Sequence, residues 1–200
     1  MTAVPTARSD WIRQARSCRR VPSDTGGTVP HGQRIWSFAI TSESTYGGNT
    51  GYDDLASSLY RYDDKVQYHG QVRAGDLAVV VVDGAAEGIA RIDRIVVHRG
   101  TKTLQRCPGC KTTDIARRRT LSPTYRCNRC KETFEHPKHD EVDVDVHEAH
   151  LIDWQALQGI SGGEVRRTAL SQGQTSIRPL EPSRVRGLLA GSPNAARLIQ

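Results

Sequence analysis

The stretch VRAGDLAVVVVDGAAEGIARIDRIVVH, residues 72–98, predicts the central part of the fold. A Gly-Asp turn opens an apolar run from Leu77 to Val82, which is typical of a buried strand. The turn DGAAEG follows, and the run from Ile89 to Val97 then alternates apolar and polar residues. The stretch therefore predicts two consecutive strands joined by a short turn.

Further strands are predicted on both sides of this stretch. Residues 35–40, IWSFAI, and residues 141–152, EVDVDVHEAHLI, alternate between two faces in the manner of half-buried strands. Between them, Leu55 and Leu59 have helical spacing, so a helix is expected in residues 52–62. Closing such a sheet into a small barrel would remove its exposed edges. We therefore expect an α+β fold, a small barrel with flanking helices.

Four of the five cysteines predict a metal site. They form the pairs CPGC and CNRC with sixteen residues between them, namely Cys107, Cys110, Cys127 and Cys130. This spacing is typical of a four-cysteine zinc site. Two disulfides would fit a chain with an export signal, and a redox dithiol would not need the second pair. Because four thiolates leave no open position for a catalytic water, we expect a structural zinc ion in a ribbon inserted at about residues 105–135.

Positive charge is concentrated around this ribbon. The chain has a formal net charge of +6, and residues 101–131 contain nine cations and one anion. Such a cluster suits a polyanionic partner, although a solvated surface is the alternative for any single cation. The candidate phosphate-binding residues are Arg117, Arg118, Arg119, Arg129 and Lys131.

Composition sets the expected domain limits. Residues 32–158 carry the periodic patterns, whereas residues 1–31 are interpreted as a flexible basic arm and residues 159–200 as a linker or C-terminal tail. The chain contains no apolar stretch that would suit a membrane span or an export signal. We therefore expect a cytoplasmic protein without a membrane partner.

The order of these motifs resembles the PUA-like superfamily, in particular its EVE and YTH-like branch. The resemblance covers about residues 34–157 and rests on IWSFAI, the loop TSESTYGGNTGYDD, RAGDLAVVVV and GIARIDRIVV. With the zinc-ribbon insertion and the later residues QTSIRPLEP, the chain looks like the N-terminal EVE-like region of bacterial modification-dependent HNH restriction nucleases. No HNH signature is found in the sequence, so we expect a non-enzymatic chain. It would be an isolated reader, or the recognition part of a longer enzyme with a C-terminal HNH nuclease.

The resemblance implies a protein that reads a modified base. The expected partner is double-stranded DNA carrying a modified cytosine, such as 5-methyl- or 5-hydroxymethylcytosine, which is flipped into an aromatic pocket. Stacking on aromatic rings contributes about 1–3 kcal/mol per base. The candidate base-binding residues are Trp36, Tyr46 and Tyr52 for stacking and Ser42, Asn49 and Asp53 for the base edge. For Trp36, a place in the core is the alternative, because it lies on the apolar face of a strand.

Two other functions stay open from the sequence. The first is an RNA-binding PUA-like protein that reads modified or structured RNA, because zinc ribbons with basic loops also bind RNA. The second is metal-dependent hydrolysis by the histidines and carboxylates between His136 and His150.

Overall fold

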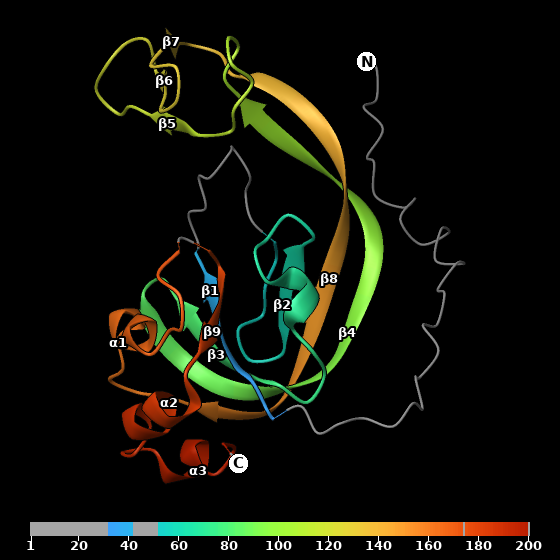
Figure 1. The fold of residues 1–200 in the computed structure, drawn as a ribbon, viewed down its shortest axis with the longest axis vertical. Coiled ribbons are helices and arrows are strands. Elements are labelled where there is room, and N and C mark those ends of the chain that lie inside the picture. The colour runs from blue at the N-terminus through green and yellow to red at the C-terminus, as the bar shows by residue number, and fades with distance from the viewer. Residues whose placement is uncertain (1–31, 42–51, 174, 200) are drawn as a thin grey trace, which may run out of the picture. The chain divides into compact units, whose positions relative to one another are not determined.

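Six strands form the main sheet of the computed structural model, which describes residues 32–41, 52–173 and 175–199 (Figure 1). They are β1 (Ile35–Ile40), β2 (Leu59–Asp63), β3 (Leu77–Val82), β4 (Ala85–Arg106), β8 (Lys138–Ala156) and β9 (Ile177–Leu180). The order across the sheet is β2-β8-β4-β3-β1-β9, in which β1 and β3 are parallel and all other neighbours are antiparallel.

The remaining elements are short. A second, three-stranded sheet contains β5 (Ile115–Arg117), β6 (Tyr125–Cys127) and β7 (Thr133–Phe134). The helices are the 3-10 helix η2 (His69–Gln71), α1 (Gly162–Arg167), α2 (Pro182–Leu188) and α3 (Pro193–Ala196). Within the part of the chain described here, no helix is long and apolar enough to cross a bilayer.

The strand pair predicted from residues 72–98 is confirmed as β3 and β4. Only two residues connect them, Asp83 with φ 46° and Gly84 with φ 85°. Positive φ at both central residues is the geometry of the two-residue hairpin turn that Asp-Gly favours, because its twist matches that of the flanking strands. The predicted turn of six residues was therefore too long, and β4 begins at Ala85.

β4 and β8 are longer than the sequence pattern indicated. They contain 22 and 19 residues and pair antiparallel from Gly88↔Ala156 to Arg106↔Lys138. Figure 1 shows them as a long curved pair that leads into the segment of β5, β6 and β7. The predicted ribbon is therefore an insertion between β4 and β8.

The alternation of β1 divides the core into two clusters. Ile35 packs with the inward residues of β3 and with the C-terminal segment. Trp36 and Phe38, on the opposite face of the strand, pack with Tyr60 and Tyr62 of β2. Each face of this part of the sheet is therefore covered by a different segment of the chain.

The helix expected in residues 52–62 is not present. Leu55 and Leu59 exchange backbone hydrogen bonds of 2.9 and 2.8 Å across a tight turn, after which β2 pairs with β8. Their four-residue spacing therefore reflects a turn. Tyr60 and Tyr62 are 3% and 1% exposed, so packing of alternate side chains outweighs the helical spacing.

The interpretation of residues 159–200 as a linker or tail is wrong for the described residues of that segment. β9 pairs antiparallel with β1, and its predecessor Ser176 accepts a further hydrogen bond from the backbone N–H of Ala39 at 2.9 Å. Seven buried side chains of the segment belong to one core cluster: Val165, Ala169, Leu180, Val185, Leu189, Ala195 and Ile199. These few apolar residues suffice because they pack into one cluster with Ile35, Leu77 and Val79 of the sheet.

The α+β class is confirmed, but the sheet is not closed into the predicted barrel. No backbone ladder joins the edge strands β2 and β9 within the described residues. The two edges approach each other at the side chain of Tyr60 in β2, whose hydroxyl lies 3.4 Å from the carbonyl oxygen of Ala39 in β1 and 3.5 Å from that of Ser176, just before β9. Stacking of Phe38 on Tyr60, with ring centroids 4.2 Å apart, fills the space between them.

Candidate functional site

The four predicted zinc ligands lie together in the ribbon. The sulfur atoms of Cys107, Cys110, Cys127 and Cys130 are all within 4.8 Å of one another. The Sγ atoms of Cys107 and Cys130 are 3.6 Å apart, and those of Cys110 and Cys127 are 3.5 Å apart. Tetrahedral zinc with bonds of about 2.3 Å would place its sulfurs about 3.8 Å apart. The thiol set therefore fits zinc in number, chemistry and spacing.

Both cysteine pairs use the same backbone turn. The N–H of the residue after each pair, Lys111 or Lys131, donates to the carbonyl of the first cysteine at 3.0 or 3.1 Å. Both lysines have positive φ, 60° and 66°. The N–H of each first cysteine donates back to the carbonyl five residues on, in Thr112 or Glu132. These repeated turns direct both pairs of thiols toward one point, so the ribbon is built around the cluster.

The predicted phosphate-binding cations have two different environments. Arg117, Arg119, Arg129 and Lys131 are exposed. The guanidinium of Arg118 instead donates to the carbonyl of Pro123, and its backbone N–H donates to Thr124 at 2.7 Å. Arg118 therefore stabilises the loop between β5 and β6, while the exposed cations are available to a partner.

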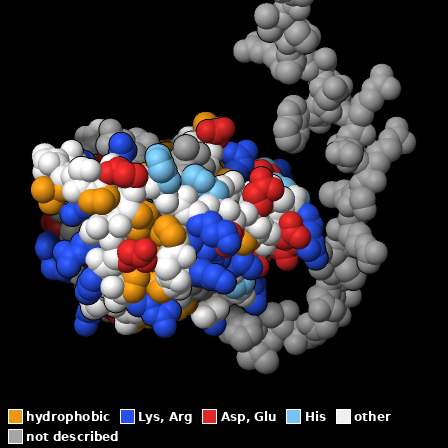
Figure 2. All heavy atoms as spheres, turned by 90° about the horizontal axis from the view of Figure 1, so that it is seen from above, with side chains coloured by type: hydrophobic (Ala, Val, Ile, Leu, Met, Phe, Trp, Pro, Cys, Tyr) orange, Lys and Arg blue, Asp and Glu red, His pale blue; other side chains and the backbone are white. Residues whose placement is uncertain are grey.

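Carboxylates offset part of the positive charge near the ribbon. Arg106 pairs with Asp140 at 2.8 Å, and Arg99 pairs with Asp145 at 3.6 Å. The face in Figure 2 likewise shows Lys and Arg side chains interspersed with Asp and Glu side chains. These two ion pairs therefore neutralise part of the positive charge near the ribbon.

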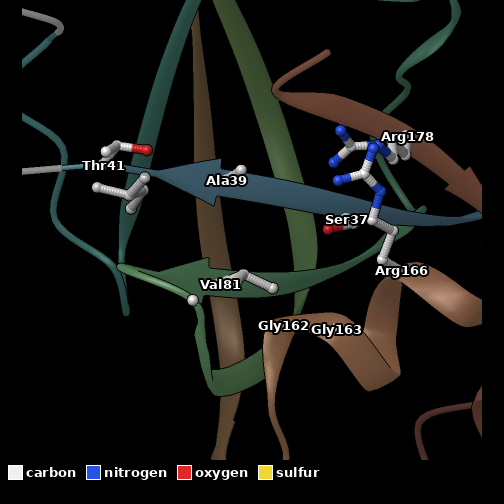
Figure 3. Close-up of a pocket in the computed structure, with 10 residues that line it drawn as sticks. Ser37, Ala39, Thr41, Val81, Gly162, Gly163, Arg166 and Arg178 are labelled. Atoms are coloured by element: carbon white, nitrogen blue, oxygen red, sulfur yellow. The ribbon is translucent and has the colours of Figure 1, made fainter. Parts of the chain in front are cut away.

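A pocket of about 250 Å³ lies at the end of β1 (Figure 3). Its lining comes from β1 and the residue after it, β3, the β3–β4 turn, α1 and β9: Ser37, Ala39, Ile40, Thr41, Val81, Gly84, Gly162, Gly163, Arg166 and Arg178. The volume is below the roughly 300–1,000 Å³ of sites for drug-sized ligands, so it suits a smaller group such as one base or one phosphate. The described lining contains two guanidinium groups and no carboxylate.

Strand pairing and helix position bring the polar groups of this pocket together. Arg178 is the register partner of Ser37 in the β1–β9 ladder, so the two side chains share a face. Figure 3 shows the guanidinium groups of Arg166 and Arg178 close together above Ser37. Partial burial and the positive charge of Arg166 lower the pKa of Arg178 from its ordinary value. The two cations therefore repel each other, and an anion between them would relieve that repulsion.

A glycine keeps the wall of the pocket close to the sheet. A Cβ atom on Gly162 would lie 2.8 Å from Cγ1 of Val81 and 3.0 Å from the carbonyl oxygen of Gly84. The N–H of Gly162 donates to that same carbonyl at 2.6 Å. Any side chain here would push α1 away from the β3–β4 turn.

Trp36, predicted to stack on a base, lies in the core. Its side chain is 1% exposed, and its indole N–H donates to Asp76 at 2.8 Å. Asp76 also accepts hydrogen bonds from the backbone N–H groups of Arg73 and Arg34. The Gly-Asp turn therefore fixes Trp36, on the face of β1 opposite Ser37.

Tyr52 and Asp53 lie together near β2. The Tyr52 hydroxyl donates to Asp63 at 2.9 Å, and burial together with this carboxylate raises the Tyr52 pKa. Asp63 is 0% exposed and also accepts from Lys102 Nζ at 2.7 Å. The side chain of Asp53 is exposed, and its carbonyl accepts from the guanidinium of Arg61. Tyr52 is thus held by its hydroxyl, and Asp53 is accessible.

The other predicted base-binding residues, Ser42, Tyr46 and Asn49, lie outside the described residues. Sequence reasoning missed Ser37, Arg166 and Arg178. The two arginines lie in the segment that was interpreted as a tail. The motif QTSIRPLEP, which contains Arg178, was the one signal that could have pointed to them.

Comparisons of the chain with protein-family models, with characterised proteins and with solved structures gave no significant match. The function is therefore inferred from the geometry of the cysteine cluster and of the two-arginine pocket.

Proposed function

We propose that this chain is a nucleic-acid-binding module of the PUA-like, EVE type that recognises a modified base, with modified cytosine in double-stranded DNA as the expected target. The observation that carries the proposal is the pocket at the end of β1, whose described lining holds Arg166 and Arg178 without a carboxylate. A separate nuclease domain or subunit would supply any cleavage.

The pocket has the chemistry that a flipped base requires. A base offers two π faces and an edge of hydrogen-bonding groups. Guanidinium planes stack on bases, and their N–H groups donate to the acceptors on base edges. Arg166 and Arg178 could fill the role that the sequence assigned to Trp36, and Ser37 adds a hydroxyl group. Gly84 leaves open space beside its backbone, which permits close approach of a ligand.

The ribbon would supply affinity that does not depend on sequence. Four thiolates bound to a structural zinc ion would hold it folded, and the exposed Arg117, Arg119, Arg129 and Lys131 would contact phosphates. Such contacts release counterions, so affinity should fall as the salt concentration rises.

Fluorescence titration with matched duplexes tests the proposal. The zinc-loaded chain is titrated into labelled duplexes that differ only in one cytosine, which is unmodified, 5-methylated or 5-hydroxymethylated. We expect tighter binding to a modified duplex at every salt concentration. The variant R117A/R119A should weaken binding to all duplexes about equally and reduce the salt dependence.

Two outcomes would count against the proposal. Equal affinity for modified and unmodified duplexes would leave only charge-driven binding. Stronger competition by single-stranded or structured RNA than by modified DNA would favour the RNA-binding alternative.

A further inference from the structure

Resting on the proposed function, we propose that Arg166 and Arg178 form an oxyanion-binding subsite that takes one compact oxyanion of nucleic acid. Two sources have this chemistry. One is the carboxylate of an oxidised base such as 5-carboxylcytosine, and the other is a phosphate group of the backbone.

The first argument is the lack of charge compensation. Among the described residues, neither guanidinium forms an ion pair, whereas Arg61, Arg91 and Arg94 all do. The one side-chain hydrogen bond found for Arg178 in this part of the chain runs from Nε to the carbonyl of Gly173 at 3.2 Å. That bond is to a neutral acceptor, so no described side chain neutralises the positive charge of the pair.

The second argument is the match between donors and ligand. A guanidinium presents parallel N–H groups that bind both oxygens of a carboxylate or phosphate. Two such forks and the hydroxyl of Ser37, which is 4% exposed as a residue, face the same pocket (Figure 3). A 5-methyl group would give these donors no acceptor, whereas a carboxylate would accept several charge-assisted hydrogen bonds.

The third argument is the shape of the lining. The glycines Gly84, Gly162 and Gly163 contribute no side chains to the wall, and the apolar part is limited to Ala39, Ile40 and Val81. The pocket is therefore small and polar on the side of the arginines. It suits a charged substituent better than an extended apolar one.

The test uses the zinc-loaded chain and labelled duplexes that carry one unmodified, 5-methyl- or 5-carboxylcytosine. The test variants are R166Q/R178Q and R166K/R178K, of which the second keeps both charges but loses the fork geometry. The control is Arg167→Gln, because Arg167 is an exposed neighbour in α1 that does not line the pocket. Unchanged unfolding midpoints in urea establish that each variant is folded.

If the oxyanion belongs to the base, wild type binds the carboxylated duplex at least about tenfold more tightly than the unmodified one. The R166Q/R178Q variant then loses this preference, R166K/R178K retains only part of it, and the Arg167→Gln variant keeps it. If the oxyanion is a backbone phosphate, R166Q/R178Q weakens binding to all three duplexes alike, and inorganic phosphate competes with the wild-type chain but not with the variant.

The subsite is overturned if folded R166Q/R178Q binds every duplex as wild type does. It is also overturned if Arg167→Gln has the same effect as the double variant. The two proposals fail separately. A preference for 5-methylcytosine that survives R166Q/R178Q, with the affinity for each duplex also unchanged, would keep the proposed function and remove the oxyanion subsite. Uniform weakening of all duplexes without any base preference would keep the subsite and remove base reading.

Discussion

Replacing Lys102 by methionine should destabilise the fold strongly, because it leaves a buried carboxylate without its cation. Lys102 of β4 reaches across β8 to Asp63 of β2, with Nζ 2.7 Å from Oδ2. The Asp63 side chain is 0% exposed and that of Lys102 is 23% exposed. Methionine keeps most of the length and apolar stem of lysine but removes the charge.

The expected loss of stability depends on the hydrogen bonds that Asp63 retains in the Lys102→Met variant. Removing one partner of a buried ion pair costs about 3–5 kcal/mol, because the other charge stays desolvated. Asp63 would still accept hydrogen bonds from the Tyr52 hydroxyl and from the backbone N–H of Lys65, both at 2.9 Å. We therefore expect the lower end, about 3 kcal/mol, which for a chain of this size lowers Tm by about 6–12 °C.

Urea unfolding followed by circular dichroism measures this loss. The matched control is Lys65→Met, because the Lys65 side chain is 53% exposed and pairs with the surface residue Asp64. Its unfolding midpoint should stay close to that of wild type. The double variant D63N/K102M should be more stable than Lys102→Met alone, because asparagine removes the unpaired charge.

A Lys102→Met protein that unfolds at the wild-type midpoint would refute the reasoning. An equal loss of stability in Lys65→Met would refute it as well, because the destabilisation would then come from the change in net charge. Failure of Asp63→Asn to recover stability in the Lys102→Met background would show that the cost does not come from the unpaired carboxylate.

Three further predictions test other parts of the structure. The Cys107→Ser variant should contain no bound zinc in elemental analysis, and its ribbon should unfold, because structural zinc binding contributes folding energy. The amide NMR signals of β1 and β3 should persist. Full zinc retention would contradict the four-thiol site. Leu189→Ala should destabilise the fold by about 2–5 kcal/mol in urea unfolding, because Leu189 is 1% exposed in the core. An unfolding midpoint equal to that of wild type would support the interpretation of residues 159–200 as a tail. Burial raises the pKa of Asp54 to about 6, so its contribution to stability is present below its unfolded pKa near 4 and is lost as the pH rises through 6. Asp54→Asn should therefore gain stability relative to wild type between pH 4 and pH 7, and a carboxyl NMR titration midpoint near 4 would contradict this.

The cysteine cluster and the β3–β4 pair could be predicted from sequence because both depend on neighbours in the chain. Two residues between cysteines and an Asp-Gly turn are local geometry, and local geometry is encoded by short motifs. The alternation in β1 likewise predicted a strand with two faces. It did not show which face would be buried more completely, and both Trp36 and Ser37 are buried.

The errors arise where long-range packing outweighs local pattern. The spacing of Leu55 and Leu59 indicated a helix, yet pairing of β2 with β8 buries Tyr60 and Tyr62 in a strand. The C-terminal segment looked like a linker because its apolar residues are sparse. Their burial becomes evident only when β9 is paired with β1.

The sequence by itself determined the four-cysteine cluster, the central strands and the α+β class, because these follow from spacing and periodicity. Only the tertiary structure decided that Trp36 is held in the core by Asp76 and that Ser37, Arg166 and Arg178 share one pocket. These three pocket residues come from β1, α1 and β9, and more than a hundred residues separate β1 from the other two elements in the sequence. No short motif can predict that these side chains lie close together, because their proximity depends on the register of β9 against β1 and on the close approach of α1 at Gly162.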